Sequence, residues 1–103
     1  MDLSVIIPVY EEEENLPRLI PEIHAALAEE GLSYEIICID DGSQDTSLAV
    51  LEEMTHSDPA LVVLSFRRNF GQTAAMQAGL DAARGKRVAL MDADLQNDPA
   101  DIP

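Results

Sequence analysis

The sequence predicts an α/β protein built on a parallel β-sheet, with its elements in the order β-α-β-α-β-α-β. Four short runs rich in Val, Ile and Leu stand out, at residues 3–9, 34–39, 61–66 and 87–91. None of these runs alternates cleanly between apolar and polar residues, which is typical of strands covered on both faces. The segments between them show helical spacing, and crossover helices between strands imply a parallel sheet with right-handed connections.

The first helix is expected over residues 16–30, after the strand at 3–9. Its apolar side chains recur at helical spacing: Leu16, Leu19, Ile20, Ile23 and Leu27. Gly31 is a typical stop for such a helix. Pro17 suits a first helical turn, whereas Pro21 does not suit a helix interior and favours a later start.

Two further helices separate the remaining strands. The segment at 46–56 ends before the Asp58-Pro59 pair. The segment at 72–84 ends at Gly85, and its alanines allow close approach to a sheet. Together with the strand at 87–91, these elements predict a Rossmann-like sheet. His24 and His56 fall on the expected helix surfaces, so we expect both side chains to be solvated.

Length, charge and cysteine content narrow the classes of protein. The chain has 103 residues, enough for one domain, and no apolar run approaches the roughly 20 residues that cross a bilayer. The formal net charge of -14 argues against direct binding to nucleic acid or to an anionic lipid surface. Cys38 lies among isoleucines, so we expect a buried apolar side chain, no disulfide, and a reducing cytoplasm as the location.

Polar residues follow each of the four predicted strands. In strand order they are Tyr10 and Glu12, Asp40 and Asp41, Arg67 and Arg68, and Asp92 and Asp94. The carboxyl ends of parallel strands meet at one edge of a sheet, where open α/β proteins bind their ligands. We therefore expect the four clusters to lie close together.

Each cluster also has a plain structural interpretation. A chain this acidic contains an Asp-x-Asp pair by chance, and Asp41-Gly42 is also typical of a hairpin turn. Ser43 or Asp45 is suited to cap the helix that follows. The four glutamates at 11–14 are most simply a solvated loop before a helix N-terminus, and the arginine pair is equally compatible with a plain surface.

Taken together, the clusters suit a nucleotide diphosphate as ligand. Asp92 and Asp94 can share a Mg²⁺ or Mn²⁺ ion, which prefers oxygen ligands, leaves positions for phosphate oxygens and neutralises a leaving diphosphate. Asp40 or Asp41 can accept hydrogen bonds from a base or ribose, and an arginine adds charge near base or phosphate. There is no G-x-G-x-x-G after the first strand and no G-x-x-x-x-G-K-[ST] anywhere in the sequence.

Four motifs in succession resemble those of family-2 glycosyltransferases with the GT-A fold: "VIIPVYEEEENLP", "DDGSQDTS", "RRNFGQTAAMQAGLDAARG" and "MDADLQNDP". The long third motif and the Asp-Ala-Asp-Leu-Gln run are similar to the polyprenyl-phosphate glycosyltransferases. This is the dolichol-phosphate mannosyltransferase-like group, which also serves undecaprenyl phosphate in bacteria. The resemblance covers essentially the whole chain and implies that residues 1–103 form the nucleotide-sugar-binding half of a GT-A fold.

The resemblance implies roles for the matching positions. The nucleotide would be bound by Pro8, Tyr10, Glu12, Asp40, Asp41, Arg68 and Asp92. The divalent cation, Mg²⁺ or Mn²⁺, would be held by Asp92, Asp94 and Gln96. The subgroup usually has Asp-Pro-Pro after this glutamine, whereas this chain has Asn97-Asp98-Pro99, so Asn97 is given no role.

The resemblance also implies an inverting, metal-dependent transfer of a hexose from a UDP- or GDP-sugar to a polyprenyl phosphate, at the cytoplasmic face of a membrane. Members of the family are considerably longer. We therefore expect a truncated, inactive part whose acceptor surface and catalytic groups lie elsewhere. An unpaired strand edge could also join two copies into a homo-oligomer.

Two alternatives stay open on the residues alone. A sugar-1-phosphate nucleotidyltransferase uses a related sheet, but it opens with a Gly-rich basic loop where this chain has four glutamates. The other alternative is a non-catalytic nucleotide-binding or regulatory α/β module. A receiver domain, one such module, would need an acidic pair after the first strand. It would also need a phosphorylated Asp after the third strand, where Arg67 and Arg68 stand.

Overall fold

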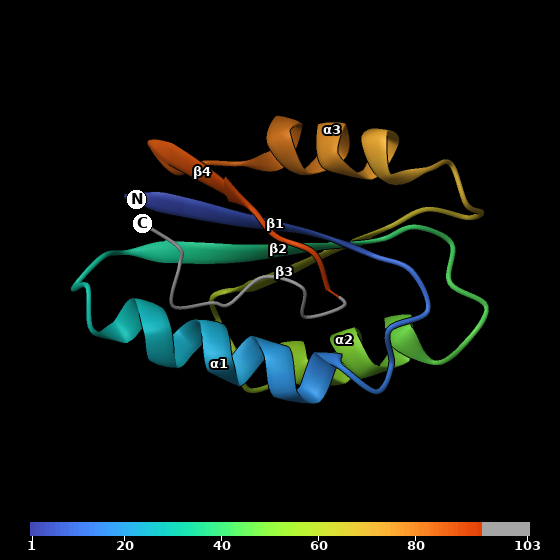
Figure 1. Ribbon diagram of the computed structural model, residues 1–103, viewed down its shortest axis with the longest axis horizontal. Helices are drawn as coiled ribbons and strands as arrows, with labels where there is room; N and C mark the ends of the chain where they lie inside the picture. Colours follow the sequence, from blue (N-terminus) through green and yellow to red (C-terminus); the bar gives the residue numbers. More distant parts are fainter. Residues whose placement is uncertain (94–103) are drawn as a thin grey trace.

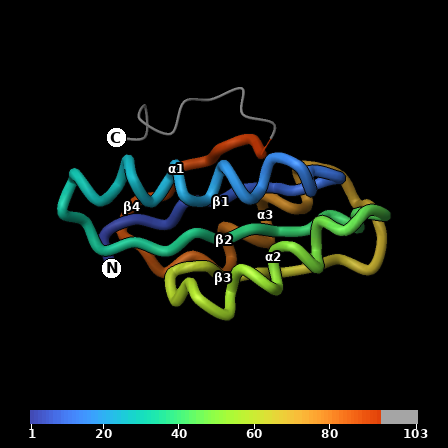
Figure 2. Tube along the Cα trace, turned by 90° about the horizontal axis from the view of Figure 1, so that it is seen from below, coloured from blue at the N-terminus to red at the C-terminus, as the bar shows by residue number. Residues whose placement is uncertain are grey.

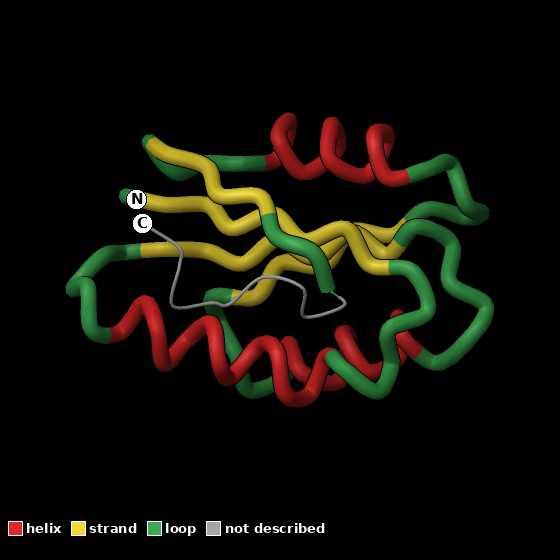
Figure 3. The backbone as a smooth tube through the Cα atoms, in the orientation of Figure 1, coloured by secondary structure: helices red, strands yellow, loops and turns green. Residues whose placement is uncertain are grey.

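The computed structural model describes residues 1–93, which form a four-stranded, all-parallel sheet with helices on both faces (Figure 1). The strands are β1 (Leu3–Val9), β2 (Tyr34–Asp40), β3 (Leu61–Ser65) and β4 (Arg87–Leu90); the helices are α1 (Leu16–Ala28), α2 (Ser47–Thr55) and α3 (Gln72–Ala82). Strands and helices alternate along the chain (Figure 3), and the sheet order is β3-β2-β1-β4. The predicted α/β class and element order are therefore confirmed. No helix within residues 1–93 is long and apolar enough to span a membrane.

Helix α1 begins at Leu16, so the later start that Pro21 suggested is wrong. Pro21 lies inside the helix, and the first turn is closed by the Leu19 backbone N–H, which donates to the Asn15 carbonyl at 2.9 Å. A proline cannot donate to the carbonyl four residues earlier, which here belongs to Pro17. Pro17 and Pro21 are both exposed, so the carbonyl that loses its helical donor lies on the solvent side of α1, where the helix can continue past the proline.

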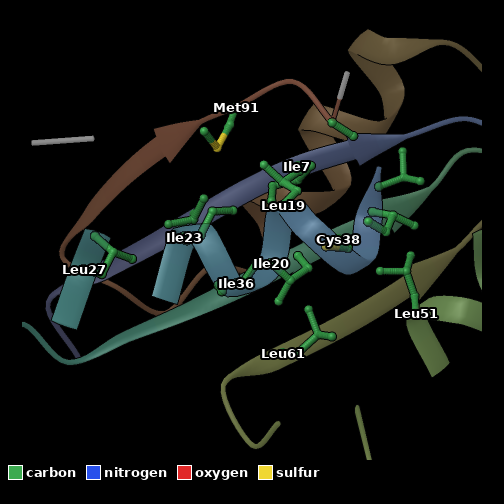
Figure 4. Close-up of a cluster of buried hydrophobic side chains, with 14 of the residues drawn as sticks. Ile7, Leu19, Ile20, Ile23, Leu27, Ile36, Cys38, Leu51, Leu61 and Met91 are labelled. Atoms are coloured by element: carbon green, nitrogen blue, oxygen red, sulfur yellow. The ribbon is translucent and has the colours of Figure 1, made fainter. Parts of the chain in front are cut away.

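The sheet separates two apolar layers. Helices α1 and α2 cover one face and α3 covers the other (Figures 1 and 2). Alternate residues of β2 divide accordingly: Ile36 and Cys38 belong to the cluster that contains α1, whereas Ile37 and Ile39 belong to the cluster beneath α3. The buried stripe of α1 is the predicted one, Leu16, Leu19, Ile20, Ile23 and Leu27. Figure 4 labels the last four of these among the buried side chains.

Cys38 is fully buried in the larger of these clusters, as predicted. Desolvation raises the pKa of its thiol to about 12, and the negative charge of Asp58 acts in the same direction. A thiol in this state behaves as a small apolar side chain.

The strand register brings the carboxyl ends of β1, β2 and β3 to one edge. Val9 pairs with Asp40, and Asp40 pairs in turn with Ser65. Main-chain hydrogen bonds continue just past the strands, from the Asp41 N–H to the Val9 carbonyl at 2.8 Å and from the Phe66 N–H to the Asp40 carbonyl at 2.9 Å. The polar residues that follow these strands consequently start from the same edge.

At the opposite end of the strands, near their amino ends, a buried carboxylate joins three segments. Glu35 of β2 is 2% exposed and accepts hydrogen bonds from the Ser4 hydroxyl at 2.6 Å and the Arg84 backbone N–H at 2.8 Å. The Arg84 guanidinium lies 3.3 Å from the other carboxylate oxygen. Desolvation, the largest influence, raises the pKa of Glu35, but these donors together hold that pKa below its usual value. The network fixes the α3–β4 connection against β1 and β2.

His24 is not a solvated side chain, so that prediction is wrong. It is half-buried, with Nδ1 2.5 Å from the Tyr34 hydroxyl and Nε2 2.6 Å from an Asp58 carboxylate oxygen. These partners come from the start of β2 and from the connection before β3, so helical spacing around His24 could not reveal them. His56, in contrast, is exposed at the end of α2, as predicted.

Candidate functional site

A hollow of about 150 Å³ opens at the carboxyl edge of the sheet. It is lined by Pro8, Val9, Tyr10, Glu12, Asp41, Gln72, Asp92 and Ala93. These residues come from the end of β1 and the connection that follows it, the residue after β2, the first turn of α3 and the segment after β4. Chain segments far apart in sequence therefore meet where open α/β sheets bind their ligands.

Five of the seven residues predicted to bind a nucleotide line this hollow: Pro8, Tyr10, Glu12, Asp41 and Asp92. Asp40 and Arg68 do not line it. Asp40 is 2% exposed, with Oδ2 accepting a hydrogen bond from the Ser43 backbone N–H at 3.2 Å and Oδ1 without a partner within residues 1–93. Arg68 is exposed on the β3–α3 connection.

The β1–α1 connection, which forms one wall of the hollow, is held by the β2–α2 connection. Glu11 adopts a left-handed backbone conformation with φ of 54°, and its N–H donates to the Ser43 hydroxyl oxygen at 2.8 Å. The Glu12 N–H donates to the hydroxyl oxygen of the buried Ser47 at the same distance of 2.8 Å. Two serines thus take up backbone donors that would otherwise depend on water.

Two of the four glutamates in this wall are also bonded through their side chains. The Glu13 carboxylate accepts hydrogen bonds from the backbone N–H and hydroxyl of Thr46, and the Glu12 carboxylate accepts one from the Asn15 amide at 2.7 Å. The interpretation of the run as a simply solvated loop is therefore wrong for Glu12 and Glu13. Of the two predicted capping residues, it is Asp45 that accepts from the first N–H of α2, at 2.8 Å.

Three carboxylates, those of Glu12, Asp41 and Asp92, line the hollow and make its electrostatic field negative. The pKa of Tyr10 is raised, first by a hydrogen bond to the Glu11 carboxylate and then by its charge, with Asp41 and Asp45 adding to the effect. Tyr10 is 42% exposed, so its ring also offers an apolar surface at the mouth of the hollow. A phosphate-bearing ligand in such a field needs a cation beside it.

Asp41 is 4% exposed and holds the β3–α3 connection. Its Oδ1 accepts a hydrogen bond from the Phe70 backbone N–H at 2.8 Å, and its Oδ2 accepts one from the Gly71 N–H at 3.1 Å. The Asn69 side-chain amide donates to Oδ2 at 3.3 Å and to the Asp41 carbonyl at 3.2 Å. The carboxylate therefore connects the end of β2 to the start of α3.

The Arg68 guanidinium stacks on an aromatic ring beside the hollow. Its central carbon lies 4.7 Å from the centre of the Phe70 ring, a cation–π arrangement. Phe70 packs edge-on against Phe66, with ring centres 5.5 Å apart. This stacking keeps a positive charge at the same edge of the sheet as the carboxylates.

Asp92 is half-buried, two residues after the end of β4. The Met91 N–H donates to the Ile6 carbonyl at 3.0 Å and so continues the β1–β4 pairing to the residue before it. The carboxylate oxygen of Asp92 has the ligand chemistry that Mg²⁺ and Mn²⁺ prefer. The other two predicted ligands, Asp94 and Gln96, lie outside the described residues. Within residues 1–93, no three His, Cys, Asp or Glu side chains are grouped as a metal site.

Gln72 is not among the predicted site residues. As the first residue of α3 it looked like part of a helix face, yet its side-chain amide donates to Asp92 Oδ1 at 3.1 Å. One signal could have indicated it. A helix that follows a parallel strand begins at the edge where the strand ends, so its first turn faces the ligand site.

An open parallel sheet with a polar hollow at its carboxyl edge defines an open α/β domain whose candidate ligand site lies at the ends of the strands. The chain belongs to glycosyl transferase family 2, whose sequence pattern matches residues 4–103. The predicted family is therefore confirmed, and membership favours glycosyl transfer over the nucleotidyltransferase and the receiver-like module.

Relatives of this chain include polyprenyl-phosphate sugar transferases by name. Dodecaprenyl-phosphate galacturonate synthase of Rhizobium johnstonii is 44% identical over 104 residues, which cover 100% of this chain and 31% of the relative. Undecaprenyl-phosphate 4-deoxy-4-formamido-L-arabinose transferase of Pseudomonas aeruginosa is 46% identical over 102 residues, covering 98% of this chain and 30% of the relative. The chain thus spans about a third of the length of these relatives.

Solved structures of GT-A glycosyltransferases share the fold, which confirms the predicted GT-A architecture. S. aureus TarS 1-349, in complex with UDP, superposes with a TM-score of 0.72 and 28% identity over 91% of this chain and 28% of the TarS 1-349 chain. The mannosyltransferase PcManGT from Pyrobaculum calidifontis, in complex with GDP-Man and Mn²⁺, superposes with a TM-score of 0.71 and 27% sequence identity. The match covers 89% of this chain and 27% of the PcManGT chain.

Proposed function

We propose that this protein is an inverting glycosyltransferase that transfers a hexose from a UDP- or GDP-sugar to a polyprenyl phosphate. The observation that carries the proposal is the hollow at the carboxyl edge of the sheet, which gathers five residues expected to bind a nucleotide. The names of the relatives support a polyprenyl phosphate acceptor. The UDP and GDP-mannose complexes of the structural neighbours support a nucleotide-sugar donor.

In this proposal the walls of the hollow bind the nucleotide. Pro8 and the exposed ring of Tyr10 pack against the base, while Glu12 and Asp41 offer hydrogen-bond acceptors to base and ribose. Asp40 supports the site from behind through the Ser43 backbone. Arg68 supplies positive charge from the neighbouring connection.

Asp92, together with Asp94 and Gln96, would hold Mg²⁺ or Mn²⁺. The ion, when bound, neutralises the charge of the leaving diphosphate. The Mn²⁺ in the PcManGT complex supports this assignment. So does the negative field around Tyr10, because an unscreened diphosphate would be repelled there.

Residues 1–103 would form the donor-binding part of the enzyme, inactive alone, with the acceptor surface and the catalytic groups contributed by other segments. A polyprenyl phosphate acceptor lies in a membrane, so the enzyme would work at the cytoplasmic membrane face.

Titration of the full-length protein with UDP and GDP, with and without Mn²⁺, tests the proposal. We expect one nucleotide to bind more tightly with Mn²⁺, and we expect Asp94→Ala to remove that dependence. Asp81→Ala is the matched control, because Asp81 is exposed on α3 and does not line the hollow. Metal-independent binding, or an unchanged Asp94→Ala variant, would overturn the site assignment.

A further inference from the structure

The first residue of α3 reaches across the hollow to the segment after β4. The Gln72 side-chain amide donates to Asp92 Oδ1 at 3.1 Å, although the two residues are 20 positions apart. Both residues also line a second, adjoining hollow with Pro8, Met76, Leu90 and Met91. The Gln72–Asp92 pair therefore lies where the two hollows meet.

Asp41 fixes the backbone at the start of α3, from which the Gln72 side chain extends. The Asp41 carboxylate binds the N–H groups of Phe70 and Gly71, the two residues directly before Gln72. A carboxylate that accepts several backbone N–H groups forms strong, charge-assisted hydrogen bonds. The start of α3 is consequently held at a defined position relative to β2, and the Gln72 amide is held relative to Asp92.

A second contact fixes the same connection. Gly42 packs so closely that a Cβ there would lie 2.2 Å from the Arg68 carbonyl carbon and 2.4 Å from the Asn69 backbone nitrogen. The β3–α3 connection is thus held by Asp41 on one side of its turn and by backbone contact with Gly42 on the other. Gln72 extends from a supported helix end rather than from a free loop.

The chemistry of a glutamine amide suits a carboxylate that must also bind something else. An amide is neutral, so it orients one oxygen of Asp92 and leaves the formal charge of the group intact. A lysine or arginine at the same place would compete with a cation for that charge. Side chains that orient ligating carboxylates in this way contribute strongly to metal affinity.

We propose that Gln72 is a positioning residue of the donor site, which orients the Asp92 carboxylate from a helix end that Asp41 holds in place. This inference rests on the proposed function, because it assumes that Asp92 contacts the nucleotide or its metal ion.

The same helix supplies a matched control. The Gln77 amide donates to Asp81 Oδ1 at 2.9 Å, so α3 contains two Gln–Asp pairs of the same chemistry. The Gln77–Asp81 pair is exposed and lies within one helical turn, outside both hollows. Gln72→Met therefore removes a Gln–Asp hydrogen bond inside the site, and Gln77→Met removes a bond of the same kind outside it.

The test measures UDP and GDP affinity of the full-length protein with Mn²⁺ by calorimetry. We expect Gln72→Met to weaken binding roughly tenfold and Gln72→Glu to weaken it further through like-charge repulsion. We expect Gln77→Met to match the wild type. In the Asp92→Asn background, Gln72→Met should cause no additional loss, because the residue acts through Asp92.

Three outcomes would overturn the positioning role. One is wild-type affinity for Gln72→Met while Asp92→Asn binds weakly, which leaves the proposed function intact. Another is a fully additive loss in the double variant, which would mean that Gln72 contacts the ligand itself. The third is wild-type affinity for Asp92→Asn, which would overturn the donor-site assignment as well.

Discussion

At the scale of single residues, Gly42 carries a conformational and a steric requirement at once. Its φ is 71°, in the left-handed region, and a Cβ would clash with the Arg68 backbone at 2.2 Å. We expect Gly42→Ala to lower the free energy of unfolding by about 2–5 kcal/mol, from strain plus overpacking. Denaturant unfolding measures this loss.

Gly31 is the control for that substitution. It has a similar φ of 67°, but within residues 1–93 no atom beyond its chain neighbours lies within 4 Å of the position that a Cβ would take, so Gly31→Ala isolates the backbone strain. We expect a loss of about 1–2 kcal/mol there. Equal losses at the two glycines would show that the close approach of the β2–α2 and β3–α3 connections at Gly42 adds nothing to the cost of the substitution.

Glu35 gives the protein a pH dependence with a defined sign. Because the net effect of its surroundings lowers the pKa of Glu35 in the folded state, its ionised form stabilises the fold at pH values above about 4.5. That contribution is lost as the pH falls below 4.5, through the lowered pKa of the folded state. We expect Glu35→Gln to cost about 1–3 kcal/mol at pH 7 and to flatten the stability profile below pH 4.5. Denaturant unfolding at pH 7 and below pH 4.5 tests this expectation. A Glu35→Gln variant whose stability falls with pH as steeply as that of the wild type would contradict it.

At the scale of elements, the His24 cluster ties α1 to the sheet. The imidazole contacts the Tyr34 hydroxyl and the Asp58 carboxylate, which belong to β2 and to the α2–β3 connection. We expect His24→Ala to lower the free energy of unfolding by about 1–3 kcal/mol and Tyr34→Phe by about 1 kcal/mol. Since the two residues share one network, the double variant should lose less than the sum.

His56 offers the comparison, because it is exposed at the end of α2. His56→Ala should change stability by less than about 0.5 kcal/mol. If both histidine variants were equally stable, the contacts of His24 would not contribute to holding α1. Thermal unfolding of the three single variants is sufficient to decide.

The elements themselves could be predicted because their signals are local. Apolar runs and helical spacing placed every strand and helix, with differences of a few residues at the ends. The gathering of Tyr10, Asp41 and Asp92 followed from topology alone, since parallel strands end at one edge. The partners of His24 and the Gln72–Asp92 bond could not be predicted, because each joins residues 10 or more positions apart through side-chain geometry that no periodicity encodes.

At the scale of the whole molecule, charge and sheet topology act against each other. The net charge of -14 makes copies of the chain repel one another. Strand β4 nevertheless forms a sheet edge that pairs only with β1 within residues 1–93. Its Val88 and Leu90 are 42% and 49% exposed, so the edge combines unpaired backbone groups with apolar side chains.

This opposition predicts salt-dependent self-association of the 103-residue chain through β4. Screening shortens the range of the repulsion from about 10 Å at 0.1 M salt to about 3 Å at 1 M, whereas backbone pairing and apolar contact persist. Sedimentation velocity should therefore show more dimer at 1 M NaCl than at 0.1 M.

Leu90→Lys should suppress the dimer at both concentrations, because an edge lysine opposes pairing. Leu80→Lys adds the same charge at a position on α3 that is 43% exposed, away from the edge, and should leave most of the dimer at 1 M salt. A chain that stays monomeric at 1 M salt, or that responds equally to both lysines, would show that β4 is not the contact.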